Sequence, residues 1–376
     1  MPKLDFIYFD AGGGHRAAAT ALKQACAERF PGWEVRLMNL QHELDSLDIF
    51  RQITGIRMED VYNLVLRKGW TLGSPQLLVA MHLLIRMYHP LQVKMLKAYW
   101  GKDAPDVAVS LIPNFNRAIY QALGAVSPKT KLVTVLTDLA DYPPNFWIER
   151  GQKQYFVCGT AKAERQALEQ GHAREMVFRV SGMVLNPRFY QTVEVDVAAE
   201  RKKLGLDPNL PTAMLLFGGY GSAVMTRIAK QIEESGLKLQ LIFICGKNTK
   251  LKEKIAAMKL KLPHFVEGFT SEIPYYMKLS DFFIGKPGPG SISEAIHLGL
   301  PVIVTRNALT LPQERYNADW VTENELGLVL KSFGGIVNGV EQMLAPGTLE
   351  RFQANTRKLN NRAIFEIPEI IDKLLP

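Results

Sequence analysis

The sequence predicts an α/β protein of two domains, each built around a parallel, doubly wound sheet. Its 376 residues exceed the size at which a single hydrophobic core usually stops growing. Short apolar runs alternate with longer amphipathic segments, which is the pattern of strands connected by helices. Glycine-rich turns that each precede a helix occur near the amino terminus and twice in the second half. A composition of 47% hydrophobic and 22% charged residues is ordinary for globular proteins.

The apolar runs locate the strands of the two sheets. In the first half we expect strands at Lys3–Phe9, Trp33–Leu40, Asp106–Ile112, Lys131–Thr137, Gln154–Cys158 and Met176–Val180, and a helix at Ala161–Gln170. In the second half we expect strands at Thr212–Phe217, Leu239–Cys245, His264–Val266, Asp281–Ile284, Val302–Thr305 and Gly327–Leu330, followed by a final helix at Leu349–Leu375. An Asn-Pro step within Gly182–Thr192 breaks the periodicity, so the domains are predicted to span 1–185 and 186–354.

The segment Gly285–Val304, with the sequence GKPGPGSISEAIHLGLPVIV, is the most informative about function. It reads as a strand end, a glycine-rich turn, a helix and a second strand. We expect Ser291 to cap the helix, so that free N–H groups at Gly290 and its neighbours, close to Gly288, face a phosphate. Glu294 lies three residues after that cap, where it either closes a capping box or holds a ribose diol.

A second glycine-rich turn lies within Phe9–Leu22. It places Gly13 and Gly14 directly before His15, at the start of an alanine-rich helix. The turn lacks the G-x-G-x-x-G spacing, so a dinucleotide site is a poor fit. We expect this loop and its histidine at the carboxyl edge of the first sheet, facing the crevice in which open α/β proteins bind ligands.

The third glycine-rich turn lies within Leu215–Gly236. Its N–H groups at Gly219, Gly221 and Ser222 are expected to form a diphosphate cradle together with the helix start in Gly285–Val304. The chain contains no D-x-D motif, so helix dipoles and hydrogen-bond donors, rather than a chelated metal, are predicted to stabilise the leaving group. The lysines predicted to pair with phosphate are Lys247 and Lys286.

Basic residues are concentrated between Arg51 and Lys102. Eight Lys or Arg and two acidic residues occur there, a surplus of six within a net charge of +8. Aromatic and aliphatic residues, ending in Tyr99 and Trp100, recur at mostly helical spacing. The stretch is either core helix with a solvated basic face or a surface for an anionic bilayer. In the second case the contacting residues are Arg67, Lys68, Trp70, Arg86, Lys94 and Lys97.

Other sequence features limit the protein's class. No apolar run approaches the ~18 residues of a membrane span, and the first strand begins without a signal peptide. Cys26, Cys158 and Cys245 are too scattered for a disulfide framework or a zinc site. No nucleic-acid-binding motif accompanies the basic charge. We therefore expect a cytoplasmic protein with no metal, no cofactor and no nucleic-acid partner.

Several motifs together resemble a known enzyme family. GGGHRAAATAL, GGYGS and GKPGPGSISEAIHLGLPVIV followed by LPQERYN are similar to monogalactosyldiacylglycerol synthases and the related bacterial diacylglycerol glucosyltransferases. These enzymes share a C-terminal domain with the transferase that adds N-acetylglucosamine to the peptidoglycan lipid precursor. The resemblance covers nearly the whole chain and implies the GT-B fold, in which two Rossmann-like domains face a cleft. It also implies a C-terminal helix, about residues 355–376, that packs back on the first domain.

The resemblance implies an activity and site residues. It implies an inverting, metal-independent transfer of a hexose from UDP-galactose or UDP-glucose to a membrane lipid such as diacylglycerol, with residues 51–102 meeting the lipid. The enzyme would then lie on the inner face of the cell membrane. It further implies that Glu294 holds the ribose, that Phe269 and Thr270 lie beside the uracil, and that Gln313 and Glu314 hold the transferred sugar.

The acceptor hydroxyl needs a base, and we predict His15 for that role. A neutral imidazole suits proton removal near pH 7, and the adjacent helix amino terminus would disfavour the charged ring. Asp10 and Asp138 are rival bases; Asp138, in TDLADYPPNFW, alternatively bonds to backbone in a turn or orients the base.

Departures from the family pattern leave alternatives open. Tyr220 in GGYGS and the form of LPQERYNADW differ from related loops, so the sugar is not determined. The same fold would suit a UDP-N-acetylglucosamine-dependent transferase or a UDP-sugar 2-epimerase. A noncatalytic, membrane-associated nucleotide-binding protein would explain the glycine loops and the charge, but it would leave His15, Gln313 and Glu314 without a role.

Overall fold

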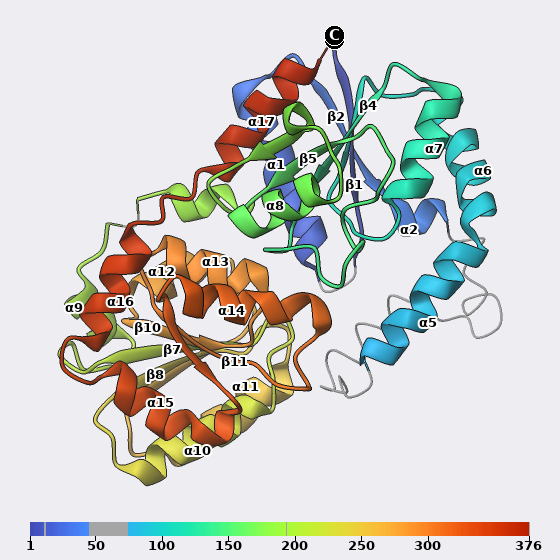
Figure 1. Ribbon diagram of the computed structural model, residues 1–376. Coiled ribbons are helices and arrows are strands. Elements are labelled where there is room, and N and C mark those ends of the chain that lie inside the picture. The colour runs from blue at the N-terminus through green and yellow to red at the C-terminus, as the bar shows by residue number, and fades with distance from the viewer. Residues whose placement is uncertain (11–12, 45–73, 193, 376) are drawn as a thin grey trace. The chain divides into compact units, whose positions relative to one another are not determined.

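The computed structural model describes residues 1–10, 13–44, 74–192 and 194–375. The chain forms two compact units. Unit 1 comprises Met1–Pro187, Leu311–Gln313 and Asn361–Pro376, and unit 2 comprises Arg188–Thr310 and Glu314–Asn360. Each unit contains one parallel sheet of six strands with helices (Figure 1).

Unit 1 has the strand order β2-β1-β3-β4-β5-β6. Its strands are β1 (Lys3–Tyr8), β2 (Glu34–Asn39), β3 (Val107–Ser110), β4 (Lys131–Val135), β5 (Tyr155–Cys158) and β6 (Val177–Arg179). Its α-helices are α1 (Gly14–Arg29), α2 (Leu40–Glu43), α5 (Ser74–Met87), α6 (His89–Trp100), α7 (Asn116–Val126), α8 (Ala161–Glu169) and α17 (Ala363–Leu374). Short 3₁₀ turns occur at Arg174–Met176 and Pro187–Tyr190. The direction of winding reverses between β1 and β3, which makes this pair the topological switch point.

Unit 2 has the strand order β12-β11-β10-β7-β8-β9, with its switch point between β10 and β7. Its strands are β7 (Thr212–Leu216), β8 (Gln240–Ile244), β9 (His264–Glu267), β10 (Phe282–Gly285), β11 (Val302–Thr305) and β12 (Gly327–Leu330). Its α-helices are α9 (Val197–Lys203), α10 (Val224–Ser235), α11 (Thr249–Ala256), α12 (Ile273–Lys278), α13 (Pro289–His297), α14 (Arg315–Glu323), α15 (Ile336–Met343) and α16 (Thr348–Arg357). Short 3₁₀ turns lie at Pro312–Glu314 and Phe333–Gly335.

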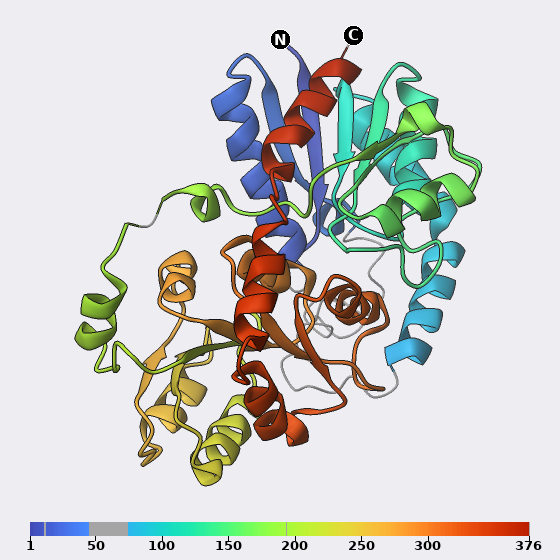
Figure 2. The same ribbon diagram turned by 60° about the vertical axis from the view of Figure 1, so that its left-hand side comes forward.

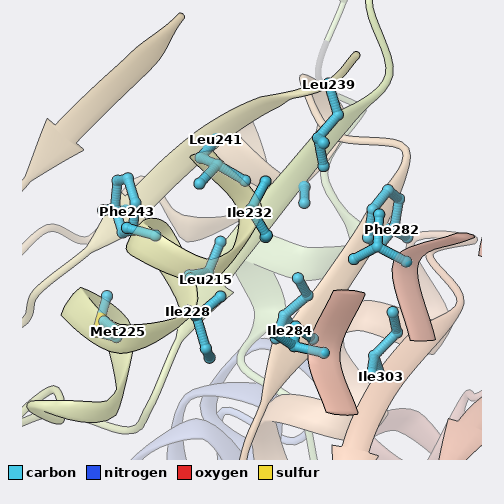
Figure 3. Close-up of a cluster of buried hydrophobic side chains, with 14 of the residues drawn as sticks. Leu215, Met225, Ile228, Ile232, Leu239, Leu241, Phe243, Phe282, Ile284 and Ile303 are labelled. Atoms are coloured by element: carbon cyan, nitrogen blue, oxygen red, sulfur yellow. The ribbon is translucent and has the colours of Figure 1, made fainter. Parts of the chain in front are cut away.

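The strands form because both sheet faces are covered, which requires nearly continuous apolar sequence. In unit 2, Leu215, Phe243 and Ile284 from three adjacent strands pack with Ile228 and Ile232 of α10 (Figure 3). All five side chains are fully buried. This core holds the carboxyl ends of β7, β8 and β10 in a fixed arrangement, and the glycine-rich loops emerge from those ends.

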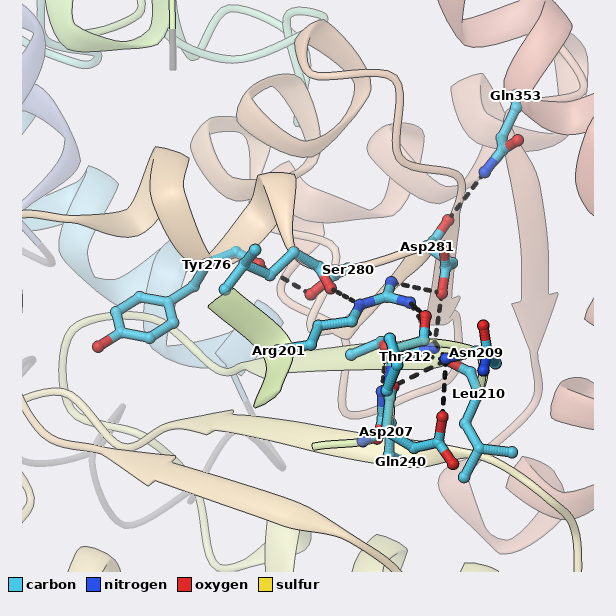
Figure 4. Close-up of polar contacts among 12 residues, drawn as sticks. Arg201, Asp207, Asn209, Leu210, Thr212, Gln240, Tyr276, Ser280, Asp281 and Gln353 are labelled. Carbon is cyan, nitrogen blue, oxygen red and sulfur yellow. Dashed lines mark hydrogen bonds and ion pairs between the residues drawn. The ribbon is translucent and has the colours of Figure 1, made fainter. Parts of the chain in front are cut away.

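A buried polar network fixes the amino edge of the same sheet (Figure 4). Arg201 of α9 donates from Nε to Leu279 O at 3.0 Å and from Nη2 to Asp281 Oδ2 at 2.9 Å. The same carboxylate oxygen accepts from Thr212 N at 2.7 Å, and Asp281 O accepts from Gln353 Nε2 at 3.3 Å. Because Thr212 begins β7 and Asp281 precedes β10, the network ties the two switch-point strands to α9 and α16.

The structure confirms the predicted α/β class and both parallel sheets. Each predicted strand is present, with ends that differ by at most two residues. The single final helix predicted at Leu349–Leu375 is wrong, because the chain forms α16 and α17 with a break between them. Asn361 stabilises that break by donating from Nδ2 to Met183 O and by accepting from Ala363 N.

Helix α17 belongs to unit 1, where it packs on α1. Figure 2 shows it as the red helix beside the blue and teal elements of that unit. Arg29 at the end of α1 forms a 2.8 Å ion pair with Glu369 of α17. Among the described helices, none combines the length and apolar character needed to span a bilayer.

Candidate functional site

The glycine-rich loops of unit 2 lie at the carboxyl ends of β7, β8 and β10. Lys247 N donates to Gly219 O at 2.8 Å, which joins the loop after β8 to the loop after β7. A Cβ on Gly246 would lie 2.3 Å from Gly219 O, so only glycine permits this approach. Gly221 donates its N–H to Gly218 O at 3.2 Å. This N–H therefore closes the turn in the structure, and the part of Gly221 in the cradle stays a prediction.

The start of α13, within the segment Gly285–Val304, is a further predicted anion site. The helix begins at Pro289, with Gly288 in extended conformation before it, so the prediction that Ser291 caps the helix is wrong. Proline suits the first helical position because it has no N–H to leave unpaired. Ser291 instead lies inside the first turn, with its Oγ 3.5 Å from Gly288 O. The free backbone donors at this helix end are then those of Gly290 and Ser291.

Glu294 lies one turn further along α13. Its carboxylate makes no hydrogen bond with the residues that the structure describes, so it closes no capping box. The side chain is half-buried. Burial raises the pKa of Glu294 to about 7. A carboxylate without partners beside free backbone donors is able to accept hydrogen bonds from a ligand's hydroxyl groups.

The loops after β8 and β9 present an exposed aromatic ring. Phe269 is 69% exposed, and Nζ of Lys247 lies 5.3 Å from its ring centroid. This geometry is a cation–π contact that leaves the ring accessible. Thr270 Oγ1 accepts from Glu272 N at 2.9 Å and so forms a turn. Ser222 similarly accepts from Val224 N at 3.3 Å, just before α10.

An ion pair joins the loop after β10 to the start of α14. Lys286 Nζ lies 2.9 Å from Oε1 of Glu314, and the acid is only 8% exposed. Asn317 donates from Nδ2 to Pro287 O at 2.8 Å and holds the same loop against α14. Gln313, the neighbour of Glu314, is grouped with unit 1.

His15 lies on the first turn of α1, at the switch point of unit 1. Its Nδ1 is 2.8 Å from Leu111 O and 3.0 Å from Thr137 Oγ1. A carbonyl oxygen only accepts, so Nδ1 carries the proton and Nε2 has the free lone pair. Burial lowers the pKa of His15 to about 4, whereas the bond to Leu111 acts in the opposite direction. Burial, rather than the helix amino terminus, therefore keeps this ring neutral. Gly13 precedes it in left-handed conformation, and Gly14 begins the helix.

Asp138 is linked to the histidine through a tryptophan. Oδ2 of Asp138 accepts from Trp147 Nε1 at 2.9 Å, and the Trp147 ring centroid lies 5.9 Å from that of His15. Asp141 in turn accepts from the backbone N–H groups of Trp147 at 2.6 Å and Asn145 at 2.9 Å. The sequence analysis missed Asp141 as the organiser of this loop, although an Asp followed by Pro and Asn is a turn signal. It also missed Thr137 and the Leu111 carbonyl.

The predicted membrane residues divide into two groups. Arg67, Lys68 and Trp70 lie outside the described residues, whereas Arg86, Lys94 and Lys97 are exposed on α5 and α6. The apolar residues exposed near them are Leu83, Leu84, Met87 and Leu91, at 60%, 44%, 64% and 45%.

Other apolar residues of α6 belong to the core. Trp100 is 1% exposed and donates from Nε1 to Asp5 Oδ2 at 2.8 Å, so for this residue the core alternative holds. Within the described parts of the chain, no group of three or more His, Cys, Asp or Glu residues is arranged to hold a metal ion.

Comparison with known proteins agrees with this architecture. Residues 215–373 match the profile of the glycosyltransferase family 28 C-terminal domain. The fold is similar to that of MurG from Acinetobacter baumannii, with a TM-score of 0.66 at 12% identity, covering 99% of this chain and 100% of that one.

Two rice proteins are related to nearly the full chain. The probable monogalactosyldiacylglycerol synthase 2 of Oryza sativa subsp. japonica is 29% identical, over 97% of this chain and 79% of the relative. The probable monogalactosyldiacylglycerol synthase 3 of the same subspecies is 30% identical, over 97% and 73%. The protein is thus a glycosyltransferase with the GT-B fold, and it belongs to the monogalactosyldiacylglycerol synthase family.

Proposed function

We propose that the protein is an inverting, metal-independent transferase that moves a hexose from UDP-galactose or UDP-glucose to a membrane lipid such as diacylglycerol. The names of the rice relatives specify a galactosyl group and diacylglycerol. The single observation that carries the proposal is the placement of His15 at the switch point of unit 1, with Nδ1 bonded to Leu111 O and Nε2 free.

The donor site is assigned to the carboxyl edge of the unit 2 sheet. Free N–H groups at Gly290 and Ser291 suit the diphosphate, because a helix amino terminus attracts anions. The Glu294 carboxylate suits the ribose diol, and the exposed ring of Phe269 suits stacking against uracil. Gln313 and Glu314 are assigned to the sugar.

The chemical step is an in-line displacement at the anomeric carbon. The acceptor oxygen forms the new C–O bond while the bond from the anomeric carbon to the diphosphate oxygen breaks. The acceptor's proton passes to Nε2 of His15, and backbone donors stabilise the charge on the departing UDP. Thr137 and Leu111 keep Nδ1 protonated, and Asp138 acts indirectly, by holding Trp147 beside the ring.

The acceptor is assigned to an anionic membrane surface contacted by α5 and α6. Four exposed apolar residues there lie near Arg86, Lys94 and Lys97. Apolar anchors with adjacent cations suit the headgroup region of a bilayer.

One incubation tests the function. The protein is mixed with radiolabelled UDP-glucose, UDP-galactose or UDP-N-acetylglucosamine and a total lipid extract, and products are separated by thin-layer chromatography. We expect label in a lipid product with a hexose donor and a rate of labelling about a hundredfold or more lower with His15→Ala. Lipid labelled only from UDP-N-acetylglucosamine would identify that nucleotide sugar as the donor in place of a UDP-hexose. An epimerised nucleotide sugar formed without lipid would indicate an epimerase, and UDP binding without any product would indicate a noncatalytic protein.

A further inference from the structure

The ion pair between Lys286 and Glu314 lies where the proposed diphosphate and sugar subsites for the UDP-sugar would meet. Lys286 follows β10, and its Cε lies 3.6 Å from the Cβ position of Gly218 and 3.4 Å from that of Gly288. The lysine stem therefore passes between the two glycine-rich loops. Its ammonium ends on Glu314, a nearly buried acid, at 2.9 Å.

We propose that Lys286 exchanges partners when the donor binds. The ammonium leaves Glu314 and pairs with the diphosphate, and the released carboxylate then accepts hydrogen bonds from hydroxyl groups of the sugar. This inference rests on the proposed function, since it requires a nucleoside diphosphate sugar at this edge of the sheet. It makes Lys286 a residue that couples the phosphate subsite to the sugar subsite.

Neighbouring lysines are less suited to the diphosphate. Lys247 stands over the ring of Phe269, and Lys252 pairs with Glu267 at 2.9 Å. Lys286 is 39% exposed at its side chain and has a flexible four-carbon stem, so it can turn without moving the backbone. The loop itself is held by the bond from Asn317 Nδ2 to Pro287 O.

The exchange has an energetic consequence. A buried carboxylate that loses its cation is destabilised unless other donors replace the cation. UDP alone pairs with Lys286 but supplies no sugar hydroxyl group to Glu314. A UDP-hexose supplies hydroxyl donors that replace the lost cation. The protein should therefore bind the complete donor more tightly than UDP. Once the sugar has been transferred, the return of Lys286 to Glu314 should favour release of UDP.

The test compares the affinities of UDP and UDP-hexose by calorimetry, without lipid so that no turnover occurs. Glu314→Gln should bind UDP about three- to tenfold more tightly than wild type, because Lys286 no longer leaves a buried acid behind. The same variant should lose most of the preference for UDP-hexose over UDP. Glu325→Gln is the matched control, since Glu325 forms an exposed ion pair with Arg351 at 3.3 Å and precedes β12, at the opposite edge of the sheet.

Lys286→Gln provides an independent arm if Glu314→Gln does not fold. It should lower the affinities for UDP and for UDP-hexose by about tenfold or more, the scale of a charged hydrogen bond. The ratio of the two affinities should stay unchanged. If Lys286 instead stays on Glu314, this variant would change UDP affinity little and Glu314→Gln would not strengthen it; either result overturns the exchange. A wild-type protein that binds neither ligand would refute the proposed function itself.

Discussion

The protonation states of single residues at the two switch points are set by burial and by one or two hydrogen bonds. His15 is neutral because of burial, and the Leu111 carbonyl decides which nitrogen holds the proton. Burial shifts the pKa of Glu294 upward instead, because it disfavours the charged carboxylate and the described residues offer no hydrogen-bond partner. Such perturbed pKa values are typical of functional sites, which agrees with the roles proposed for both side chains.

His15→Ala should lower kcat by about two to four orders of magnitude, the usual contribution of a general base. UDP affinity should stay near the wild-type value, because the donor loops belong to unit 2. In the wild-type enzyme the base works unprotonated, and burial lowers its pKa to about 4. The kcat should therefore stay level as pH falls from 8 to about 5.5, where an ordinary histidine would already be charged. If His15→Ala kept more than a tenth of wild-type kcat, another residue would have to be the base.

Glu294→Gln should stabilise the protein at pH 8 but not at pH 4.5. The pKa of Glu294 is raised from 4.5 to about 7, so the folded state holds a proton that the unfolded state releases between these values. Stability from this group is present below pH 4.5 and is lost as pH rises through 7. The substitution should recover about 2–3 kcal/mol at pH 8. Thermal scans at the two pH values should therefore show a higher Tm than wild type at pH 8 and no gain at pH 4.5.

The same substitution should weaken UDP binding at pH 8 by about tenfold, if the carboxylate accepts from the ribose. Equal Tm gains at both pH values would contradict the burial of a titrating acid. Unchanged UDP affinity would remove Glu294 from the ribose site.

At the scale of elements, loop ends and helix faces carry the function. The glycine-rich loops can approach one another because Gly246 has no side chain. Helix α6 places Leu96 and Trp100 in the core of unit 1, and α5 leaves Leu83 and Met87 exposed. This helix pair thus combines core packing with exposed apolar residues.

The triple substitution of Arg86, Lys94 and Lys97 by Gln should weaken binding to vesicles containing phosphatidylglycerol. Each basic residue near an anionic surface contributes about 1 kcal/mol, and salt screens the effect. Co-sedimentation should fall for the variant and, in wild type, with rising salt, while UDP affinity is unchanged. The matched control replaces Lys230, Lys238 and Lys254, which are exposed in unit 2. Equal binding to neutral and anionic vesicles would argue against this surface.

At the scale of the whole molecule, two parallel sheets each expose a switch point to ligands. In the proposed mechanism, unit 2 supplies backbone donors and Lys286 to a diphosphate, and unit 1 supplies a base. Activity should therefore survive excess EDTA, because these groups stabilise the leaving UDP without a cation. Assays with and without EDTA, after dialysis against chelator, measure this. Loss of activity that is restored by Mg²⁺ or Mn²⁺ would refute the metal-free cradle.

The sequence by itself determined the fold class, the strands and the glycine-rich turns. These are local properties, since a strand that lies between two covered faces must be nearly continuously apolar, as Val302–Val304 is. His15 and Glu294 were recognisable for the same reason, because their position after a strand or on a helix's first turns is encoded by adjacent residues. The break between α16 and α17 was not recognisable from adjacent residues, since it depends on the hydrogen bond from Asn361 to the distant Met183.

Only the tertiary structure decided which groups meet and in what state. His15 and the Leu111 carbonyl are 96 residues apart in sequence, and β1 and β3 bring them together only because they are neighbours in the sheet. The start of α13 at Pro289, the turn bond of Gly221 and the core position of Trp100 likewise depend on packing. The pKa values of His15 and Glu294 follow from burial, which a linear pattern does not specify. Lys286 and Glu314 form their ion pair because loop and helix converge at one sheet edge, a non-local result of the topology.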